Sequence, residues 1–318
     1  MMEENQIAVV IPFFKKDFFD KTLESLSIQT NKRFTVYVGN DASPDDPLEI
    51  IGRYSNMIKI RYTNFDQNLG ANSLSKQWQR CLNQVDIEEW VIILGDDDVL
   101  GMNCIAEFYT HLTNINMEAI DVIRFASLVI DSQGKAISEV QRHPVIENSI
   151  RFLFRKINGN ARSSISEHIF KISSVRKYKF KDLPLAWHTD DLALLEFSNF
   201  GNIFSINAAV VYIRLSKISI SGRNDLSRLK NTSSFLFYNY LLKNYSTRFS
   251  KMEKRVLLKK MEKRVLDDKA NFILFSKLAL LYFRKYDMPG FALFLLDFSR
   301  NIRNSYHSRL KGYKGKMK

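Results

Sequence analysis

The first hundred residues alternate between short apolar runs and amphipathic segments. Runs of apolar and β-branched residues predict buried strands at 7–11, 34–38, 58–62 and 90–94. Segments with apolar residues at helical spacing predict helices at 18–28, 48–54 and 73–85. Strand, loop and helix recur about every 30 residues, which is typical of βαβ units in a parallel sheet. The pattern therefore predicts an α/β fold with a mostly parallel central sheet flanked by helices.

After residue 100 the pattern becomes less regular. Helices are predicted at 103–112, 150–156 and 192–200, and strands at 121–130, 164–173 and 203–214. From residue 224 the chain becomes basic, aromatic and helical. We therefore expect two domains, an α/β domain over residues 1–222 and a basic α-helical region over residues 223–318.

The formal charge of +13 is concentrated in the second region. Residues 1–222 contain 24 Lys and Arg against 27 Asp and Glu, whereas residues 223–318 contain 23 against 7. The basic region is a solvated helical hairpin, or it faces an anionic membrane or nucleic acid. Its apolar segments 272–283 and 291–298 adjoin basic stretches and favour the first two readings, so no nucleic acid partner is expected. No run reaches the roughly 18 uncharged apolar residues of a membrane span.

The cysteine content bears on the compartment. Cys81 and Cys104 provide neither a disulfide framework nor paired metal-ligand spacing, which suits a reducing environment. We expect a cytoplasmic protein, peripheral at the inner face of the membrane if the basic region binds lipid.

Three consecutive carboxylates follow the fourth predicted strand, at Asp96, Asp97 and Asp98. Adjacent carboxylates at the end of a buried strand repel one another unless a cation or strong donors neutralise them. Asp oxygens suit Mg²⁺ or Mn²⁺, which often bind through one or two carboxylates and a substrate's phosphates. A solvated acidic turn is the alternative reading.

Other loop residues also follow predicted strand ends. They are Pro12, Phe14, Asp41, Asn68 and Gly70. Ligands of open α/β sheets bind beyond the carboxyl ends of the strands, so these residues and the acidic triplet are expected to share one crevice. The glycine-rich motifs of dinucleotide-binding and P-loop proteins are absent from the sequence.

Five segments together resemble family 2 glycosyltransferases, an inverting group with the GT-A fold. The segments are Val9–Phe14, Asn40–Asp46, Asn68–Gly70, Leu94–Leu100 and Trp187–Asp191. They extend over about residues 7–215, and their order and strand-end placement agree with the family. The resemblance implies a GT-A-like domain that takes its sugar from a nucleotide-diphosphate sugar, expected to be UDP-linked. The Gln-x-x-Arg-Trp mark of processive synthases is absent, which favours a single addition.

The resemblance also implies roles on the donor side. The residues expected to bind the nucleotide sugar are Pro12, Phe14, Asp41, Asn68, Gly70 and Asp96. Asp41 resembles the carboxylate that receives the imide N–H of a uracil-type base, although an Asx turn would also explain it. Asn68 and Gly70 would equally suit a plain turn. Gly95 stands where the family's DXD motif often has its first Asp, so two frames remain, and we favour Asp97 and Asp98 as ligands of Mg²⁺ or Mn²⁺.

On the acceptor side, Asp191 resembles the catalytic base and Asp190 its acidic neighbour. The alternative is that both carboxylates only stabilise the start of a helix. Trp187 is expected to stack on the acceptor sugar, or to be a core residue. His188 is expected to contact acceptor or diphosphate, or to be structural. Arg214 is expected to steady the acceptor or the pyrophosphate, or to form a structural ion pair.

These expectations combine into one function and two alternatives. The expected function is a metal-dependent, inverting glycosyltransferase of cell-surface polysaccharide biosynthesis, acting on a saccharide or lipid-linked saccharide. A nucleotidyltransferase also combines carboxylates, metal and nucleotide, but its Gly-rich first loop is missing. A non-catalytic basic adaptor that binds membrane or nucleic acid, built on a decayed transferase domain, is the other alternative.

Overall fold

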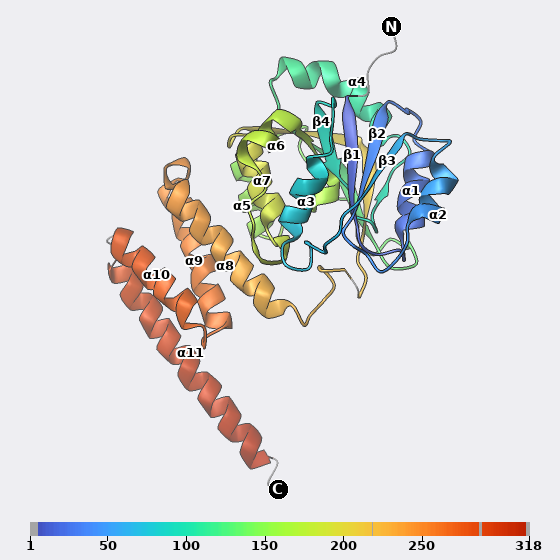
Figure 1. The fold of residues 1–318 in the computed structure, drawn as a ribbon. Coiled ribbons are helices and arrows are strands. Elements are labelled where there is room, and N and C mark those ends of the chain that lie inside the picture. The colour runs from blue at the N-terminus through green and yellow to red at the C-terminus, as the bar shows by residue number, and fades with distance from the viewer. Residues whose placement is uncertain (1–5, 218, 286–287, 316–318) are drawn as a thin grey trace. The chain divides into compact units, whose positions relative to one another are not determined.

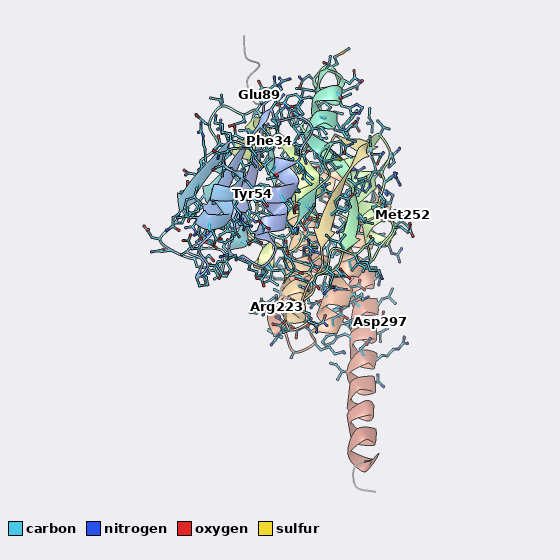
Figure 2. The ribbon with its side chains drawn as sticks, turned by 90° about the vertical axis from the view of Figure 1, so that its right-hand side faces the viewer. Phe34, Tyr54, Glu89, Arg223, Met252 and Asp297 are labelled. Atoms are coloured by element: carbon cyan, nitrogen blue, oxygen red, sulfur yellow. The ribbon has the colours of Figure 1, made fainter. Side chains whose placement is uncertain are left out.

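The computed structural model describes residues 6–217, 219–285 and 288–315. Contacts divide the chain into two compact units, Met1–Asn224 and Asp225–Lys318. Figure 2 marks Arg223 near the end of the first unit, and Met252 and Asp297 on helices of the second. The predicted boundary after residue 222 lies close to this division.

One mixed sheet runs through the first unit. Its strands are β1 (Ile7–Phe13), β2 (Phe34–Asn40), β3 (Ile60–Asn64), β4 (Trp90–Ile93), β5 (Val99–Leu100), β6 (Val122–Ile130), β7 (Ile146–Asn148), β8 (His168–Lys171) and β9 (Asn202–Arg214). Their order is β3-β2-β1-β4-β8-β6-β9-β5, and β7 pairs with β9. β1 to β4 are parallel to one another, as are β6 and β9, whereas β8, β5 and β7 pair antiparallel with their neighbours. The prediction of a mostly parallel central sheet is confirmed.

Helices cover both faces of this sheet (Figure 1). The helices are α1 (Phe19–Ser27), α2 (Leu48–Tyr54), α3 (Leu74–Leu82), α4 (Cys104–Met117), α5 (Ser149–Ile157), α6 (Ile172–Tyr178) and α7 (Thr189–Phe197). Residues of α1, α2 and α4 share a buried apolar cluster with one face of the strands. Residues of α3, α5, α6 and α7 share a second cluster with the other face. The side chains of β1, β2, β4 and β8 alternate between the two clusters, as the two-residue period of a strand requires.

Two predicted strands differ from the structure. The first continues through Pro12 to Phe13. Proline is tolerated there because the pairing of β1 with β4 ends at Val10, so no ladder bond on that side needs its missing N–H. The strand predicted at 164–173 is instead a 3₁₀ turn at Ile165–Glu167, the four residues of β8, and the start of α6. Apolar residues in this stretch serve three short elements, so their alternation was misleading.

The second unit is helical, as the sequence predicts. Its helices are α8 (Ser227–Asn244), α9 (Lys251–Asp267), α10 (Phe272–Lys285) and α11 (Met288–Gly315). A capping box starts α9, because Ser250 and Glu253 each bind the other's backbone N–H. No helix in the described residues has the length and apolarity needed to cross a membrane.

Candidate active site

The carboxyl ends of β1, β2 and β4 bring three predicted segments together. The N–H of Asp41 donates to the carbonyl of Phe13 at 3.0 Å. The Asp96 carboxylate accepts from the N–H groups of Phe14 and Lys15, each at 2.8 Å. The loop after β1 therefore ties the loop after β2 to the acidic triplet after β4. The three loops therefore meet at one end of the sheet, where the strand order predicts a crevice.

Asp41 is buried at the centre of the first part of this crevice. Its carboxylate accepts from the N–H groups of Leu69, at 2.7 Å, and Gly70, at 2.8 Å, and forms an ion pair with Arg80. A Cβ added at Gly70 would lie 2.4 Å from Asp41 Oδ2, so a side chain there would displace the carboxylate. Asn68 does not reach Asp41, because its side chain accepts from the N–H of Ala71 and closes the turn.

A cavity of about 270 Å³ adjoins this cluster. Its lining residues are Asn64, Phe65, Asp66, Gln67 and Arg80. The Arg80 guanidinium stacks on the Phe65 ring, with its carbon 4.0 Å from the ring centroid, and donates to the Gln67 carbonyl. An aromatic face, a cation and a carboxylate stand together here, a combination suited to a planar nucleobase.

The three carboxylates of the triplet have different partners. Asp96 holds the loop after β1, as described above. Asp98 is buried and accepts from the Ser166 hydroxyl and from the backbone N–H of Arg214, the latter at 2.8 Å. The Asp97 carboxylate is partly exposed and accepts no hydrogen bond from the described residues. Asp97 is therefore the member of the triplet that is left for a ligand.

The raised pKa values of the three carboxylates indicate that a bound cation would stabilise their ionised forms. Burial raises the pKa of Asp97 to about 8, with help from Asp98 and Asp96. Burial likewise raises the pKa of Asp98 to about 6, and that of Asp96. A divalent ion beside Asp97 would relieve this repulsion, so the residues present fit Mg²⁺ or Mn²⁺. No group of three or more His, Cys, Asp and Glu in the described part of the chain forms a complete metal site, so substrate oxygens would have to complete the coordination.

The other predicted carboxylates lie in the first turn of α7. Asp191 is buried; it forms an ion pair with Lys156 of α5, and its Oδ2 lies 2.7 Å from His188 Nδ1. Burial alone would raise the pKa of Asp191, but Lys156 and His188 outweigh it and lower the pKa below its usual value. Asp190 is partly exposed, and burial followed by the charge of Asp191 raises its pKa. The two neighbours thus have opposite electrostatic environments.

The turn before α7 is conformationally strained. Leu185, Ala186 and His188 have φ values of 60°, 50° and 70°, in the left-handed region that residues other than glycine seldom adopt. The rings of Trp187 and His188 meet edge to face, with centroids 5.9 Å apart. Trp187 is partly exposed, and its stacking on an acceptor sugar stays a prediction.

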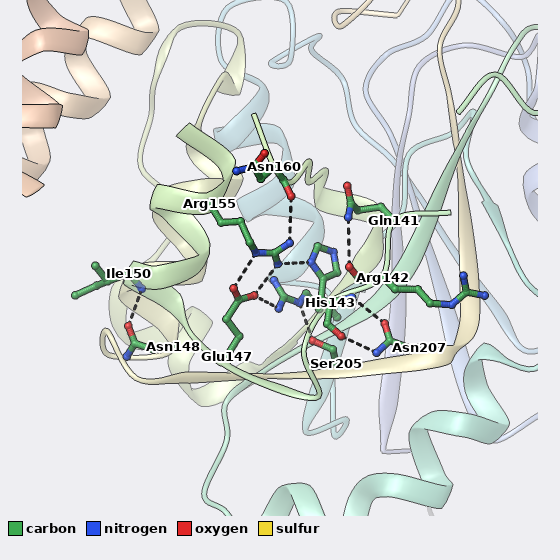
Figure 3. A network of polar contacts seen from close by, with 11 residues as sticks. Gln141, Arg142, His143, Glu147, Asn148, Ile150, Arg155, Asn160, Ser205 and Asn207 are labelled. Atoms are coloured by element: carbon green, nitrogen blue, oxygen red, sulfur yellow. Dashed lines mark hydrogen bonds and ion pairs between the residues drawn. The ribbon is translucent and has the colours of Figure 1, made fainter. Parts of the chain in front are cut away.

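A buried polar network fixes the end of α5 next to Asp191 (Figure 3). Glu147 of β7 accepts two hydrogen bonds from Arg155, at 2.9 and 2.8 Å, and one from Arg124 of β6. His143 lies 2.7 Å from Arg155, and burial followed by Arg124 and Arg155 lowers its pKa to about 3, so the neutral ring accepts from the guanidinium. Because Arg155 is held in this way, Lys156, its neighbour in sequence, is presented to Asp191.

Ser166 and Glu167 connect the two halves of the site. The Ser166 hydroxyl bonds to Asp98 and accepts from the N–H of Gly95. Glu167 is buried, and burial raises its pKa to about 7. Its charge also contributes to the raised pKa of Lys156, behind Asp191 and Asp190, so the two groups lie within electrostatic reach. This short turn therefore contacts Asp98 directly and lies within electrostatic reach of Lys156, the partner of Asp191.

The side chain of Arg214 is engaged by other groups of the protein, unlike that of an arginine left free to bind phosphate. Its guanidinium donates to the carbonyls of Asp97, at 2.9 Å, and Asp131, at 2.8 Å, and lies over the ring of Phe18. These contacts make it a brace for the triplet, and its contact with acceptor or pyrophosphate stays a prediction.

The sequence analysis did not assign roles to Arg80, Lys156 and Ser166. Their partners are 39, 35 and 68 residues away in the chain, so no local pattern marks them.

Comparisons with known structures find the same fold. Staphylococcus aureus TarS residues 1–349, solved with UDP-GlcNAc, matches with a TM-score of 0.56 and 15% identity over 82% of this chain and 80% of that one. The mannosyltransferase PcManGT of Pyrobaculum calidifontis, solved with GDP-Man and Mn²⁺, matches with a TM-score of 0.54 and 11% identity over 96% and 83%. The match to a longer TarS chain covers only 43% of that chain. A search among curated proteins found no significant match.

The match to a family model identifies the family of the chain, whereas the structural comparisons show only its fold. The model for glycosyl transferase family 2 matches residues 8–183, more than half of the chain. That range holds Asp41, the cavity that adjoins it and the acidic triplet. The chain therefore belongs to glycosyl transferase family 2, whose members transfer a sugar from a nucleotide sugar.

Proposed function

We propose that this protein is an inverting glycosyltransferase with a UDP-linked sugar donor. The acceptor would be a hydroxyl of a saccharide or lipid-linked saccharide in cell-surface polysaccharide biosynthesis. The observation that carries the proposal is the meeting of the loops that hold Asp41 and the acidic triplet at the carboxyl ends of the parallel strands. Family membership favours this function over a nucleotidyltransferase or a non-catalytic adaptor.

The donor nucleotide would lie along the loops after β1, β2 and β3. The base would enter the cavity beside Phe65 and Arg80 and donate its imide N–H to Asp41, which still has a lone pair after its three bonds. Pro12 and Phe14 would line the pocket, Asn68 and Gly70 would shape its turn, and Asp96 would meet the ribose. Structures of TarS with UDP-GlcNAc and PcManGT with GDP-Man support a nucleotide-sugar donor.

A divalent ion would lie at the diphosphate, held through Asp97 with Asp98 beside it. When bound, Mg²⁺ or Mn²⁺ supplies positive charge to the leaving diphosphate. Asp97 suits this role because its carboxylate accepts no hydrogen bond from the residues that the structure describes, while Asp98 is restrained by Ser166 and the Arg214 N–H. The Mn²⁺ in the PcManGT complex supports the same choice of ion.

Asp191 would act as the base. The acceptor hydroxyl oxygen forms a bond to the anomeric carbon, its proton passes to Asp191, and the bond from that carbon to the diphosphate oxygen breaks. Attack from the face opposite the leaving group inverts the configuration. Because Lys156 and His188 lower its pKa, Asp191 stays ionised at neutral pH and is ready to accept a hydrogen bond from the hydroxyl.

Lys156 and His188 would act as positioning residues for this carboxylate. Both oxygens of Asp191 are held by them, so the base has one orientation. The partly exposed Asp190, Trp187 and His188 would offer the acceptor polar contacts and a stacking surface. Arg214 would contribute through the triplet that it braces.

A thermal-shift panel tests the donor. Full-length protein with Mn²⁺ is heated with UDP-, GDP- and dTDP-sugars, and the matching donor at about 100 times its Kd should stabilise the fold by about 2.7 kcal/mol, several degrees in Tm. The Asp41→Asn variant should lose the shift, whereas Asp46→Asn, at an exposed carboxylate on the same loop, should keep it. If no nucleotide sugar raised the Tm of the wild type, or Asp41→Asn responded normally, the proposal would be wrong.

A further inference from the structure

Helices α10 and α11 form a hairpin joined by aromatic side chains. Phe275 of α10 meets Phe294 and Phe298 of α11, with ring centroids 6.0 and 5.1 Å apart. Further along, Tyr282 meets Phe291 at 5.6 Å. These contacts already provide the hairpin with an apolar seam, so the large apolar side chains on its outer face do not form its core.

That outer face is nonetheless strongly apolar. Nine of the 21 exposed large hydrophobic residues in the described chain lie between residues 272 and 302. They are Phe272, Ile273, Leu280, Phe283, Met288, Leu293, Leu295, Leu296 and Ile302. Phe272 is 76% exposed and Ile273 is 64% exposed. Such a concentration of solvent-facing apolar side chains is characteristic of an interaction surface.

The exposed residues follow the helical repeat. Ile273 and Leu280 are seven residues apart on α10, and Met288, Leu295 and Ile302 are seven apart on α11. Seven residues make close to two helical turns, so each set forms a stripe along one side of its helix. Each of the two packed helices therefore carries an apolar stripe that is exposed to solvent.

Cations accompany these stripes. Lys277 is exposed between Ile273 and Leu280, and Arg300 and Arg303 are exposed beyond Leu296. Residues 272–303 contain five Lys and Arg against two Asp, within a region whose formal charge is 23 positive against 7 negative. A second copy of the same basic surface would be repelled, whereas anionic lipid headgroups would be attracted. Apolar side chains bordered by cations are the composition of helices that lie in a membrane interface.

We propose that the outer face of the α10–α11 hairpin docks on an anionic lipid bilayer, with its exposed Phe, Ile and Leu side chains among the acyl chains. The helices lie along the surface, since no helix in the described residues can span it. The inference extends the proposed function, because a lipid-linked saccharide acceptor is presented at such a surface. Insertion of apolar side chains into the bilayer distinguishes this surface from a region that binds membranes by charge alone.

Vesicle flotation of the full chain tests the proposal. We expect wild-type protein to float with vesicles that contain phosphatidylglycerol and to float much less with pure phosphatidylcholine. Phe272→Ser with Ile273→Ser should reduce binding to the anionic vesicles about tenfold, because two inserted apolar side chains are lost. The matched control is Ile87→Ser with Met117→Ser, which removes two equally exposed apolar side chains from the first unit and should leave binding unchanged.

Two further measurements separate the possible outcomes. The melting temperature of each variant shows that it is folded, and light scattering reports its mass in solution. Equal flotation of the two double variants would overturn the proposal, as would a wild-type dimer that the Phe272→Ser/Ile273→Ser variant loses, since a second copy would then cover this face. Thermal shifts with nucleotide sugars in lipid-free solution should not change in this variant. If vesicles bind but no nucleotide sugar does, the docking surface stands and the proposed function fails.

Discussion

The acidic triplet and the Asp190–Asp191 pair differ in how the negative charge of their carboxylates is neutralised. Burial and mutual repulsion raise the pKa of Asp97 to about 8. Asp191 is more deeply buried than Asp97, yet Lys156 and His188 lower its pKa. On the proposed donor side, Asp97 therefore leaves a negative charge that a ligand can neutralise. On the proposed acceptor side, the cation that neutralises Asp191 is Lys156 of the protein itself.

The difference separates two tasks. A site that must bind and release an ion with each diphosphate gains from an unpaired carboxylate, because a permanent protein cation would compete with the ion. A base must present an ionised oxygen in one orientation, and a fixed Lys provides both conditions. The same residue type thus serves different chemistry because its neighbours differ.

The largest expected effect is at Asp191. Replacing it with Asn should lower kcat on the order of 10³-fold, because the acceptor proton loses its base. Donor affinity should stay unchanged, since Asp191 is bound by Lys156 and His188 and not by residues that line the proposed nucleotide pocket. The measurement is transfer rate together with donor Kd, and the control is Asp182→Asn at an exposed carboxylate before α7. A variant with near-normal turnover would remove Asp191 from the mechanism.

Replacing Lys156 tests whether its charge sets the pKa of Asp191. Lys156→Met removes the charge that lowers the pKa of Asp191, so the acid limb of kcat/KM should move to higher pH. Asp191 faces Lys156 of α5 together with His188 and Asp190 of its own segment. We expect an activity loss of about tenfold or more near pH 5 and a smaller loss near pH 8. Lys156→Arg should largely keep the profile, and exposed Lys177→Met is the control. An unshifted acid limb in a folded Lys156→Met variant would contradict the positioning role.

The smallest expected effect is on stability. Groups with a raised pKa bind more protons in the folded than in the unfolded chain, so their contribution to the free energy of unfolding falls as pH rises from about 4 to about 8. Asp97, Glu167 at about 7 and Asp98 at about 6 all act in this direction. Asp191 acts in the opposite sense, and only at more acidic pH. Metal-free protein should lose about 2 kcal/mol or more between pH 5 and pH 8.

Thermal melts with and without Mn²⁺ measure this effect. Added Mn²⁺ should restore the loss at pH 8, and Asp97→Asn should make it smaller while removing the response to the ion. A pH dependence that Asp97→Asn leaves intact would show that the triplet is not its source.

Much of the first half of the fold follows from local patterns. The predicted helix at 48–54 has the bounds of α2, and the strands at 34–38 and 90–94 agree with β2 and β4 to within two residues. β2 and β4 are apolar runs because both of their faces are buried, and α2 has an apolar side because one face of the helix packs on the sheet. β5 has two residues and β8 has four, so neither is long enough to establish a period, and both depend on partners far along the chain.

The site was foreseeable in part for the same reason. Asp41 and the triplet follow strand ends in sequence, so topology alone predicts that they meet. Arg80, Lys156 and Ser166 lie on a helix or turn whose surroundings become known only when the sheet is assembled. A lysine in the last turn of an amphipathic helix resembles any solvated lysine until Asp191 is placed beside it.

The bond between Asp98 and the backbone of Arg214 spans 116 residues and has a consequence for synthesis of the chain. On the ribosome, β1 to β4 emerge long before β9, so the nascent chain carries three clustered carboxylates without the strand that completes their surroundings. Until residue 214 leaves the exit tunnel, Asp98 lacks the backbone N–H of Arg214, and ions or chaperones in the cell have access to its carboxylate. We therefore expect the donor site to mature late in translation, after the scaffold that surrounds it.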